Sequence, residues 1–497
     1  MQIVAKPARR IRTVEGSCWA CREHRVKCKL QKPNCSRCLK KGLSCEYGKY
    51  RLKWGAIVAP DKFGQKKRSS ASQQEAKLEI MSLPLPRFNS DSKMMYFQMI
   101  ISPRLTARSV PWDYDSLKFA SKDTLLKDLI DAMSCAHFMV QTKQEPELYK
   151  SKQIARVSAL KNLSSILQLD PSAESKINPT AIFRGSVLLG LLDGVIEPDS
   201  SSYRPTQHIN GGRAILDKYR DQITNNTAVT LKDKVNAEIM SVFATMDLTY
   251  SLLTGSSPYF KPQFWFEFGS CDAWWGNVDQ SDPFLEIMSI LTTLAVLGHS
   301  MKTSHRPPSM DQLLEIQERL AQFILPARSA QAIVKTSERS SFQSWSCFCS
   351  AYANTAMIYC LRALWSCTLE DDRVQCAVSM FVDDLISASN DTLQHCLLFP
   401  LLIAGYHTQD TRQRDVIRSS CMTCYGYLFF GSIRLIIEFL EERWARSTER
   451  LSEVRIEDSL KVKLEFDLEP FPEFAEEGPT TTWWDNFEEF GRKTFVF

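Results

Sequence analysis

Apolar side chains recur with the 3.6-residue period of a helix along most of the chain beyond residue 90, and strand-like alternation is scarce. The segment 309–324 is a clear case, because its apolar residues share one helical face: Leu313, Ile316, Leu320 and Phe323. Ser309 stands three residues before Gln312, which is the spacing of a capping box at a helix start.

The same period predicts further helices at 286–301, 351–367, 373–388 and 412–443. In the last of these, Gly426 and Gly431 are predicted to break the helix. The fold is therefore predicted to be mainly α, with an all-α array of about a dozen helices.

Between residues 51 and 90 the period is lost, and Gly, Pro, Ser and charged residues are frequent. Without a heptad repeat, this segment is predicted to be a basic, flexible linker and not a coiled coil. The expected organisation is a small cysteine-rich module at 14–50, the linker at 51–90, a helical domain at 91–460 and a tail at 461–497. A homodimer, if one forms, must then use the helical domain, and binding as a monomer is the alternative.

The formal net charge of +4 is unevenly distributed over the 497 residues. Residues 1–70 contain 19 Lys and Arg against 4 Asp and Glu, which leaves 42 against 53 in the rest of the chain. A basic N-terminal region on a mildly acidic body favours an anionic partner for that region, with nucleic acid the leading candidate.

The first residues, MQIVAKPARRIR, lack the apolar run of a secretory signal, so we expect synthesis in the cytosol, where disulfides are rare. The nearest approach to a membrane span is 427–440, which Arg434 interrupts. We therefore expect no membrane partner.

Six of the 16 cysteines lie between residues 18 and 45 and repeat a C-x2-C-x6-C unit twice: Cys18, Cys21, Cys28, Cys35, Cys38 and Cys45. Such spacing in the cytosol predicts metal ligands, and thiolates suit Zn2+ in tetrahedral sites. Six sulfurs can fill the eight positions of two ions only if two sulfurs bridge, so the repeat predicts a binuclear cluster. Metal binding would then supply most of the folding free energy, on the order of 10 kcal/mol.

Two alternatives are weaker. Two independent four-ligand sites would require His24 and one more donor, and a loose metallothionein-like cluster would not need so strict a repeat.

With Pro33 in the middle loop and Arg22, Arg25 and Lys27 between the second and third cysteines, this spacing resembles the Zn2Cys6 binuclear cluster of fungal transcription factors. The resemblance implies two Zn2+ ions, with Cys18 and Cys35 as the bridging pair. It also implies a helix after the second cysteine that enters the DNA major groove and reads a CGG triplet.

The run from Cys21 to Cys28 departs from the usual C-R-x-R-K-x-K-C, because His24 stands where a permanent cation is common and Arg25 where a Lys is common. Arg25 and Lys27 are predicted to contact base edges or lie near them, since Arg can fork onto guanine, whereas neutral His24 offers one donor and one acceptor. The other basic residues are predicted to contact phosphates: Arg22, Lys29, Lys32, Arg37, Lys40 and Lys41.

Three fragments of the body resemble the second type of fungal-specific transcription factor regulatory domain. They are HINGGRAIL at 208–216, FPLLIAG at 399–405 and FGSIRLIIEFLEERW at 430–444, with Arg414 before the last. The resemblance implies a large all-α regulatory domain that controls the output of the DNA-binding module, by binding a metabolite or a partner.

Motifs for catalysis are not apparent, and no enzyme is predicted. The chain has no HExxH, GxSxG or glycine-rich phosphate loop, and the acidic pairs at 371–372 and 383–384 lack a carboxylate four residues on. We interpret the remaining candidate groups as packed or hydrogen-bonded side chains: Cys347, Cys349, Cys421, Cys424 and His208.

The tail has an unusual composition: residues 464–490 contain nine acids, seven Phe or Trp, and no Lys or Arg. Acidic residues interleaved with aromatics are typical of activation segments that bind coactivators. The alternative is that the tail docks on the helical domain, with an alternating stretch at 462–468 as a terminal strand.

These features predict a sequence-specific, DNA-binding transcription factor for RNA polymerase II genes, located in the nucleus. Lys66-Lys67-Arg68 is a short candidate import signal. We expect an activator at CGG-containing sites, working with coactivators as a pathway-specific metabolic regulator. The alternatives are a helical metabolite sensor or enzyme that uses the zinc module only for localisation, and a zinc module that binds RNA or protein.

Overall fold

The computed structural model describes these residues: 17–18, 20–21, 24, 26–32, 34–43, 45, 89–107, 123–142, 146–167, 178–199, 204–224, 234–324, 339–387, 392–446 and 482–496. The chain divides into two compact units, Met1–Ala71 and Ser72–Phe497. The first contains the six clustered cysteines. The second contains the helical body, by which we mean the described part of 89–446, and a C-terminal segment at 482–496.

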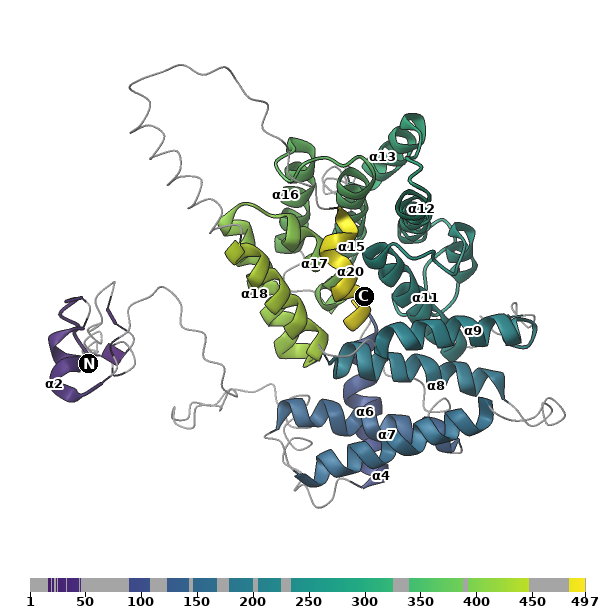
Figure 1. Ribbon diagram of the computed structural model, residues 1–497, viewed down its shortest axis with the longest axis horizontal. Helices are drawn as coiled ribbons and strands as arrows, with labels where there is room; N and C mark the ends of the chain where they lie inside the picture. The colour runs from purple at the N-terminus through teal and green to yellow at the C-terminus, as the bar shows by residue number, and fades with distance from the viewer. Residues whose placement is uncertain are drawn as a thin grey trace, which may run out of the picture. The chain divides into compact units, whose positions relative to one another are not determined.

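The helical body is a succession of α-helices (Figure 1). They are α4 (Ser90–Tyr96), α6 (Thr124–Gln141), α7 (Pro146–Leu167), α8 (Pro179–Leu191), α9 (Arg204–Thr224), α11 (Lys234–Thr254), α12 (Pro283–Ser304), α13 (Met310–Ile324), α15 (Arg339–Tyr359), α16 (Asp372–Ser387), α17 (Leu398–His407), α18 (Thr411–Leu428) and a helix at 431–446. Short π or 3-10 turns join or extend them: η2 (Phe97–Ile101), η3 (Ser102–Leu105), η5 (Leu192–Ile196), η6 (Pro262–Phe268), η8 (Cys360–Leu364) and η9 (Thr392–Cys396).

The prediction of a mainly α fold is confirmed. Within the described residues the only strand-like pairing is an isolated bridge between Ala273 and Gly276. Helix α13 begins at Met310, and the Ser309 hydroxyl accepts a hydrogen bond from the Gln312 backbone N–H at 3.2 Å. Of the apolar face predicted for this helix, Leu313, Ile316 and Leu320 are buried and Phe323 is half-buried.

Of the two breaks predicted in 412–443, the one at Gly431 adjoins the observed interruption, whereas the one at Gly426 is wrong. Helix α18 runs through Gly426 without interruption and ends at Leu428. Phe429 then adopts a left-handed conformation with φ of 55°, and the next helix begins at Gly431. The Phe429 N–H caps the helix by bonding the Tyr425 carbonyl at 2.9 Å, so a non-glycine residue occupies the left-handed position that ends α18.

Aromatic side chains form much of the core between η6, α12 and α15. Trp265, Trp274, Trp275, Phe284 and Phe348 are all fully buried. Two of the indole N–H groups are satisfied by hydroxyls, because Trp265 donates to Thr292 Oγ1 at 2.6 Å and Trp274 to Thr245 Oγ1 at 2.9 Å. Rings of this size account for a large share of the burial that stabilises the body.

Within the part of the chain that the structure describes, two helices are apolar and long enough to cross a membrane by length and composition alone, at Pro179–Ile196 and Pro283–Ser304. Sequence reasoning, which singled out 427–440, overlooked both. Of these stretches, 83% and 61% are buried inside the protein. That burial is the ordinary environment of a core helix, so they are weak evidence for a membrane.

The C-terminal segment folds back on the helical body. Helix α20 (Trp483–Lys493, yellow in Figure 1) contacts α11 and α9. Of the two alternatives for the tail, docking is the one observed for residues 482–496. The segment docks as a helix, whereas the alternating stretch at 462–468 lies outside the described residues.

Buried histidines give the first testable prediction. Burial lowers the pKa of both His137 and His407 to about 3, whereas an unfolded histidine titrates near 6.5. Below pH 6.5 the unfolded chain binds more protons, so the free energy of unfolding falls with pH between about 6.5 and 3. Each histidine should cost about 1.4 kcal/mol by pH 5.5, measured by urea unfolding.

The matched variant is His407→Phe, which keeps a ring against Trp483, where the two planes lie 13° apart with centroids 5.3 Å apart. It should lose about half of the pH dependence that His137 and His407 produce together. An identical pH dependence in the variant would show that His407 does not contribute.

Candidate zinc centre and nucleic-acid interface

A short helix fixes two of the six clustered cysteines. Helix α2 (Ser36–Lys41) begins directly after Cys35, whose sulfur accepts a hydrogen bond from the Cys38 backbone N–H at 3.4 Å. The helix ends at Gly42, which has φ of 61° and therefore a conformation that glycine adopts without a Cβ penalty. The next N–H, of Leu43, closes the cap on the Cys38 carbonyl at 3.0 Å.

The six sulfur atoms form two overlapping groups of four. One is Cys18, Cys21, Cys28 and Cys35, and the other is Cys18, Cys35, Cys38 and Cys45. Within each group all sulfurs lie within 4.8 Å of one another. Cys18 and Cys35 belong to both groups, and their sulfurs are 3.8 Å apart. This is the arrangement that two tetrahedral ions with two bridging thiolates require.

The electrostatics of the cysteines favours a divalent cation. Burial raises the pKa of Cys18 and Cys21, and raises that of Cys38 to about 12, so these thiols resist deprotonation without a countercharge. The backbone N–H of Cys38 instead lowers the pKa of Cys35 to about 6. The donor set, six sulfurs from a reduced chain, fits two Zn2+ ions, which supply the missing positive charge.

Backbone N–H groups point at other sulfurs of the cluster. The Leu30 N–H donates to Cys28 at 3.4 Å, and the Cys35 N–H donates to Cys45 at 3.1 Å. Such donors favour thiolate over thiol and orient the sulfur, as outer-shell partners of metal ligands do.

The basic residues around the cluster are largely exposed. His24, Lys27, Lys29, Lys32, Lys40 and Lys41 are exposed, and Arg37 is half-buried. Lys40 and Lys41 occupy the last turn of α2. Arg22 and Arg25 lie outside the described residues. A positively charged surface of this kind is suited to a phosphate backbone.

The other groups singled out from the sequence are packed in the body. Cys347, Cys349, Cys421 and Cys424 are buried, and burial raises the pKa of Cys349, Cys421 and Cys424. Asp384 accepts hydrogen bonds from Ser350 at 2.5 Å and Asn354 at 3.2 Å, and Asp371 pairs with Arg373 at 2.8 Å.

Two buried carboxylates were missed by sequence reasoning. Asp193 in η5 pairs with Arg156 at 2.6 Å and with His208 at 2.9 Å, so His208 is a hydrogen-bonded histidine. Asp247 pairs with Arg213 at 2.6 Å and accepts a bond from the Tyr259 N–H at 2.8 Å. The only sequence signal was that both basic partners, His208 and Arg213, fall within the fragment HINGGRAIL.

Both parts of the chain match known protein families. Residues 92–497 match the family described as "Fungal specific transcription factor domain", and residues 16–54 match the "Fungal Zn(2)-Cys(6) binuclear cluster domain".

Individual relatives are similar over short stretches only. The chain is 32% identical over 77 residues to the "Aflatoxin biosynthesis regulatory protein" of Aspergillus flavus, covering 16% of this chain and 17% of that protein. It is 53% identical over 34 residues to the "Geodin cluster transcription factor" of Aspergillus terreus, covering 7% and 15%. It is 40% identical over 55 residues to the "Arginine metabolism regulation protein II" of Saccharomyces cerevisiae, covering 11% and 6%.

These matches span less than a fifth of each relative's length, and no solved structure matches the chain. The match over 92–497 covers most of the sequence, and it follows a cysteine cluster with the geometry of a binuclear centre. The chain therefore belongs to the fungal specific transcription factor domain family and carries a Zn(2)-Cys(6) binuclear cluster domain at its N-terminal end.

Proposed function

We propose that this protein is a nuclear, zinc-dependent transcription factor that binds duplex DNA sequence-specifically and regulates RNA polymerase II genes. The observation that carries the proposal is the pair of four-sulfur groups that share Cys18 and Cys35. In this proposal the six cysteines hold two Zn2+ ions, which supply the charge and cross-links that a module of this size needs in order to fold.

The DNA contacts follow from charge and exposure. Arg25 and Lys27 contact base edges of a CGG-containing site, and His24 lies beside them. Arg22, Lys29, Lys32, Arg37, Lys40 and Lys41 contact phosphates, which position the module without reading sequence. The exposure of the described members of this set supports the assignment.

The helical body is proposed to be a regulatory domain that controls the output of the DNA-binding module, and not an enzyme. Three of the relatives carry names that refer to the control of one biosynthetic or metabolic pathway, which supports a pathway-specific activator. In this proposal the zinc module is 14–50, the linker is 51–90, the regulatory domain is 91–460 and the tail is 461–497. Coactivators are the proposed partners of the activator, and a homodimer, if formed, uses the helical domain.

The zinc centre predicts unequal effects of two cysteine substitutions on metal content. Cys18→Ser removes a donor from both four-sulfur groups and should leave almost no bound zinc. Cys45→Ser affects one group only and should retain about one ion per chain, since the other group keeps four sulfurs. Elemental analysis of the purified full chain measures both, and wild type should hold two ions.

Cys376→Ser is the matched control, because Cys376 is an exposed cysteine of α16 outside the cluster. It should keep both ions. If Cys18→Ser and Cys45→Ser each lose a single ion, the two groups do not share Cys18 as a bridge.

The DNA-binding assignment predicts different losses at two basic residues. Arg25→Ala should cost roughly 1–3 kcal/mol at a CGG site and relax discrimination at one base pair. Lys40→Ala should weaken binding to all duplexes alike and lower the salt dependence by about one phosphate contact. Titration of both variants against CGG and scrambled duplexes at several salt concentrations measures this.

A single-stranded RNA competitor tests the rival reading of the module. Displacement of CGG duplex by RNA at equal concentration would favour an RNA-binding module. In the duplex titration, an Arg25→Ala variant that loses the same affinity for every duplex would show that Arg25 does not read a base.

A further inference from the structure

The aromatic residues of the C-terminal segment are buried, although its composition is typical of activation segments. In α20 the side chains of Trp483, Trp484, Phe487 and Phe490 are at most 8% exposed. Phe487 lies 4.5 Å from Tyr406 and 4.6 Å from Trp483, measured between ring centroids. The outward face of the helix instead carries the exposed residues Asp485, Glu489 and Arg492.

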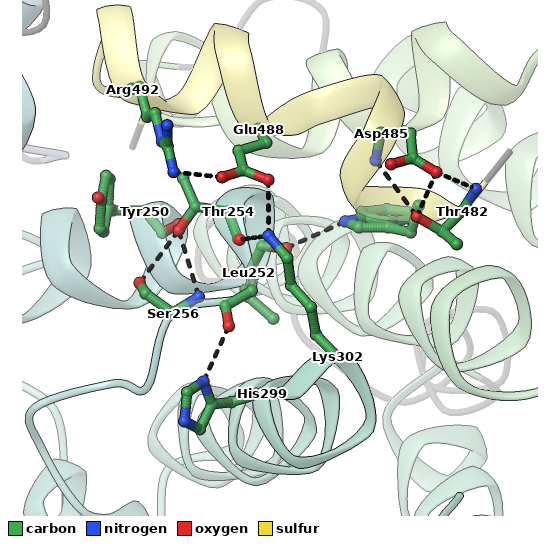
Figure 2. A network of polar contacts seen from close by, with 12 residues as sticks. Tyr250, Leu252, Thr254, Ser256, His299, Lys302, Thr482, Asp485, Glu488 and Arg492 are labelled. Carbon is green, nitrogen blue, oxygen red and sulfur yellow. Dashed lines mark hydrogen bonds and ion pairs between the residues drawn. The ribbon is translucent and has the colours of Figure 1, made fainter. Parts of the chain in front are cut away.

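Specific polar contacts fix the helix in this position (Figure 2). The Trp483 indole N–H donates to the Leu252 carbonyl at 3.0 Å. Lys302 of α12 reaches both the Thr254 carbonyl at the end of α11, at 2.7 Å, and Glu488 of α20, at 2.6 Å. One lysine thus joins the negative end of one helix to a carboxylate of another.

The last residues form a second attachment. The Thr494 hydroxyl and the Phe495 backbone N–H both donate to the Gly194 carbonyl, each at 2.8 Å. The Phe495 ring covers Gly194 so closely that a Cβ at that position would lie 2.3 Å from it. The body therefore has a surface shaped for this segment.

An aromatic side chain packed in this way cannot at the same time enter the groove of another protein. A coactivator that binds an amphipathic helix does so through the apolar face, and the body already covers that face of α20. We propose that the docking of residues 482–496 on the helical body is an autoinhibitory contact, which conceals an aromatic, acidic coactivator-binding helix until the segment is released.

This inference rests on the proposed activator function and adds how the activity is held low. Lys302 and Glu488 keep 31% and 29% of their side chains exposed, so solvent weakens their attraction. A partner or metabolite that favours the released state shifts the equilibrium by its differential affinity for the two states.

Gly491→Leu tests the contact from the α20 side. A Cβ at Gly491 would lie 2.7 Å from Leu253 Cβ, an atom close to the α11 backbone, so leucine should force α20 away while every aromatic and acidic residue of the segment remains. The full chain should then activate a reporter with CGG sites at least threefold more than wild type. Gly426→Leu is the matched control, because a Cβ there meets nothing within 4 Å, and its output should be unchanged.

A charge reversal tests the same contact through its ion pair, and it also removes the bond from Lys302 to the Thr254 carbonyl. Lys302→Glu places a carboxylate beside Glu488 and should raise reporter output. The double variant Lys302→Glu with Glu488→Lys restores opposite charges and should return the output toward wild type. Hydrogen exchange of residues 482–496 verifies release in each variant and shows whether the body stays folded.

The outcomes separate this inference from the proposed function. Faster exchange of 482–496 with unchanged or reduced output, while DNA binding is retained, overturns autoinhibition and makes the segment a structural element. Loss of CGG binding by the wild-type chain overturns the proposed function instead. Should Gly491→Leu unfold the body, the charge reversal and its rescue decide the question.

Discussion

The sharing of Cys18 and Cys35 between two four-sulfur groups is the constraint on which the N-terminal module depends. Its helix α2 has six residues, far below the length at which an isolated helix is stable in water. Among its described residues, the core consists of buried cysteines with Ala20 and Val26 packed against them. The buried thiols resist ionisation, and only a cation lets them become ligands together. Metal binding, folding and the display of basic residues are therefore one event, and loss of either shared sulfur affects both halves of the module.

The helical body is stabilised by other interactions than the N-terminal module, whose core is the cysteine cluster. Its core is a large set of apolar and aromatic side chains, with the carboxylates of Asp193 and Asp247 each paired to an arginine. Breaking such a buried pair leaves an uncompensated charge, so each pair holds its helices in one arrangement. The body can thus keep its fold whether or not the zinc module is folded, and a chelator should affect the two units unequally.

The sequence was informative wherever one local rule decided the outcome. The helical period with Ser309 at its start located α13 to within a residue, and the cysteine spacing predicted a binuclear cluster, whose shared pair the family resemblance supplied. Prediction from the sequence failed where contacts between residues far apart in the chain determine the structure. Gly426 should have broken α18, but the helix ends at Leu428 and is followed by Phe429 in a left-handed conformation, with its ring centroid 6.4 Å from that of His137 in α6. Asp193 itself was not singled out, because its partners Arg156 and His208 come from other helices, and only His208 falls within a fragment that resembles the family. Arg25, the main predicted base reader, lies outside the described residues, so that assignment still rests on sequence.

The C-terminal segment shows why composition alone could not decide between activation and docking. Acids interleaved with aromatics stay solvated when no complementary apolar surface is within reach, and fold against such a surface when one exists. Here the surface exists: Gly194 makes room for Phe495, the Leu252 carbonyl accepts the Trp483 N–H, and Lys302 meets Glu488. None of these three partners is near the segment in sequence. If the segment also binds a coactivator, as proposed, the same apolar face serves the body or the coactivator but not both at once, and packing and activation compete for one set of side chains.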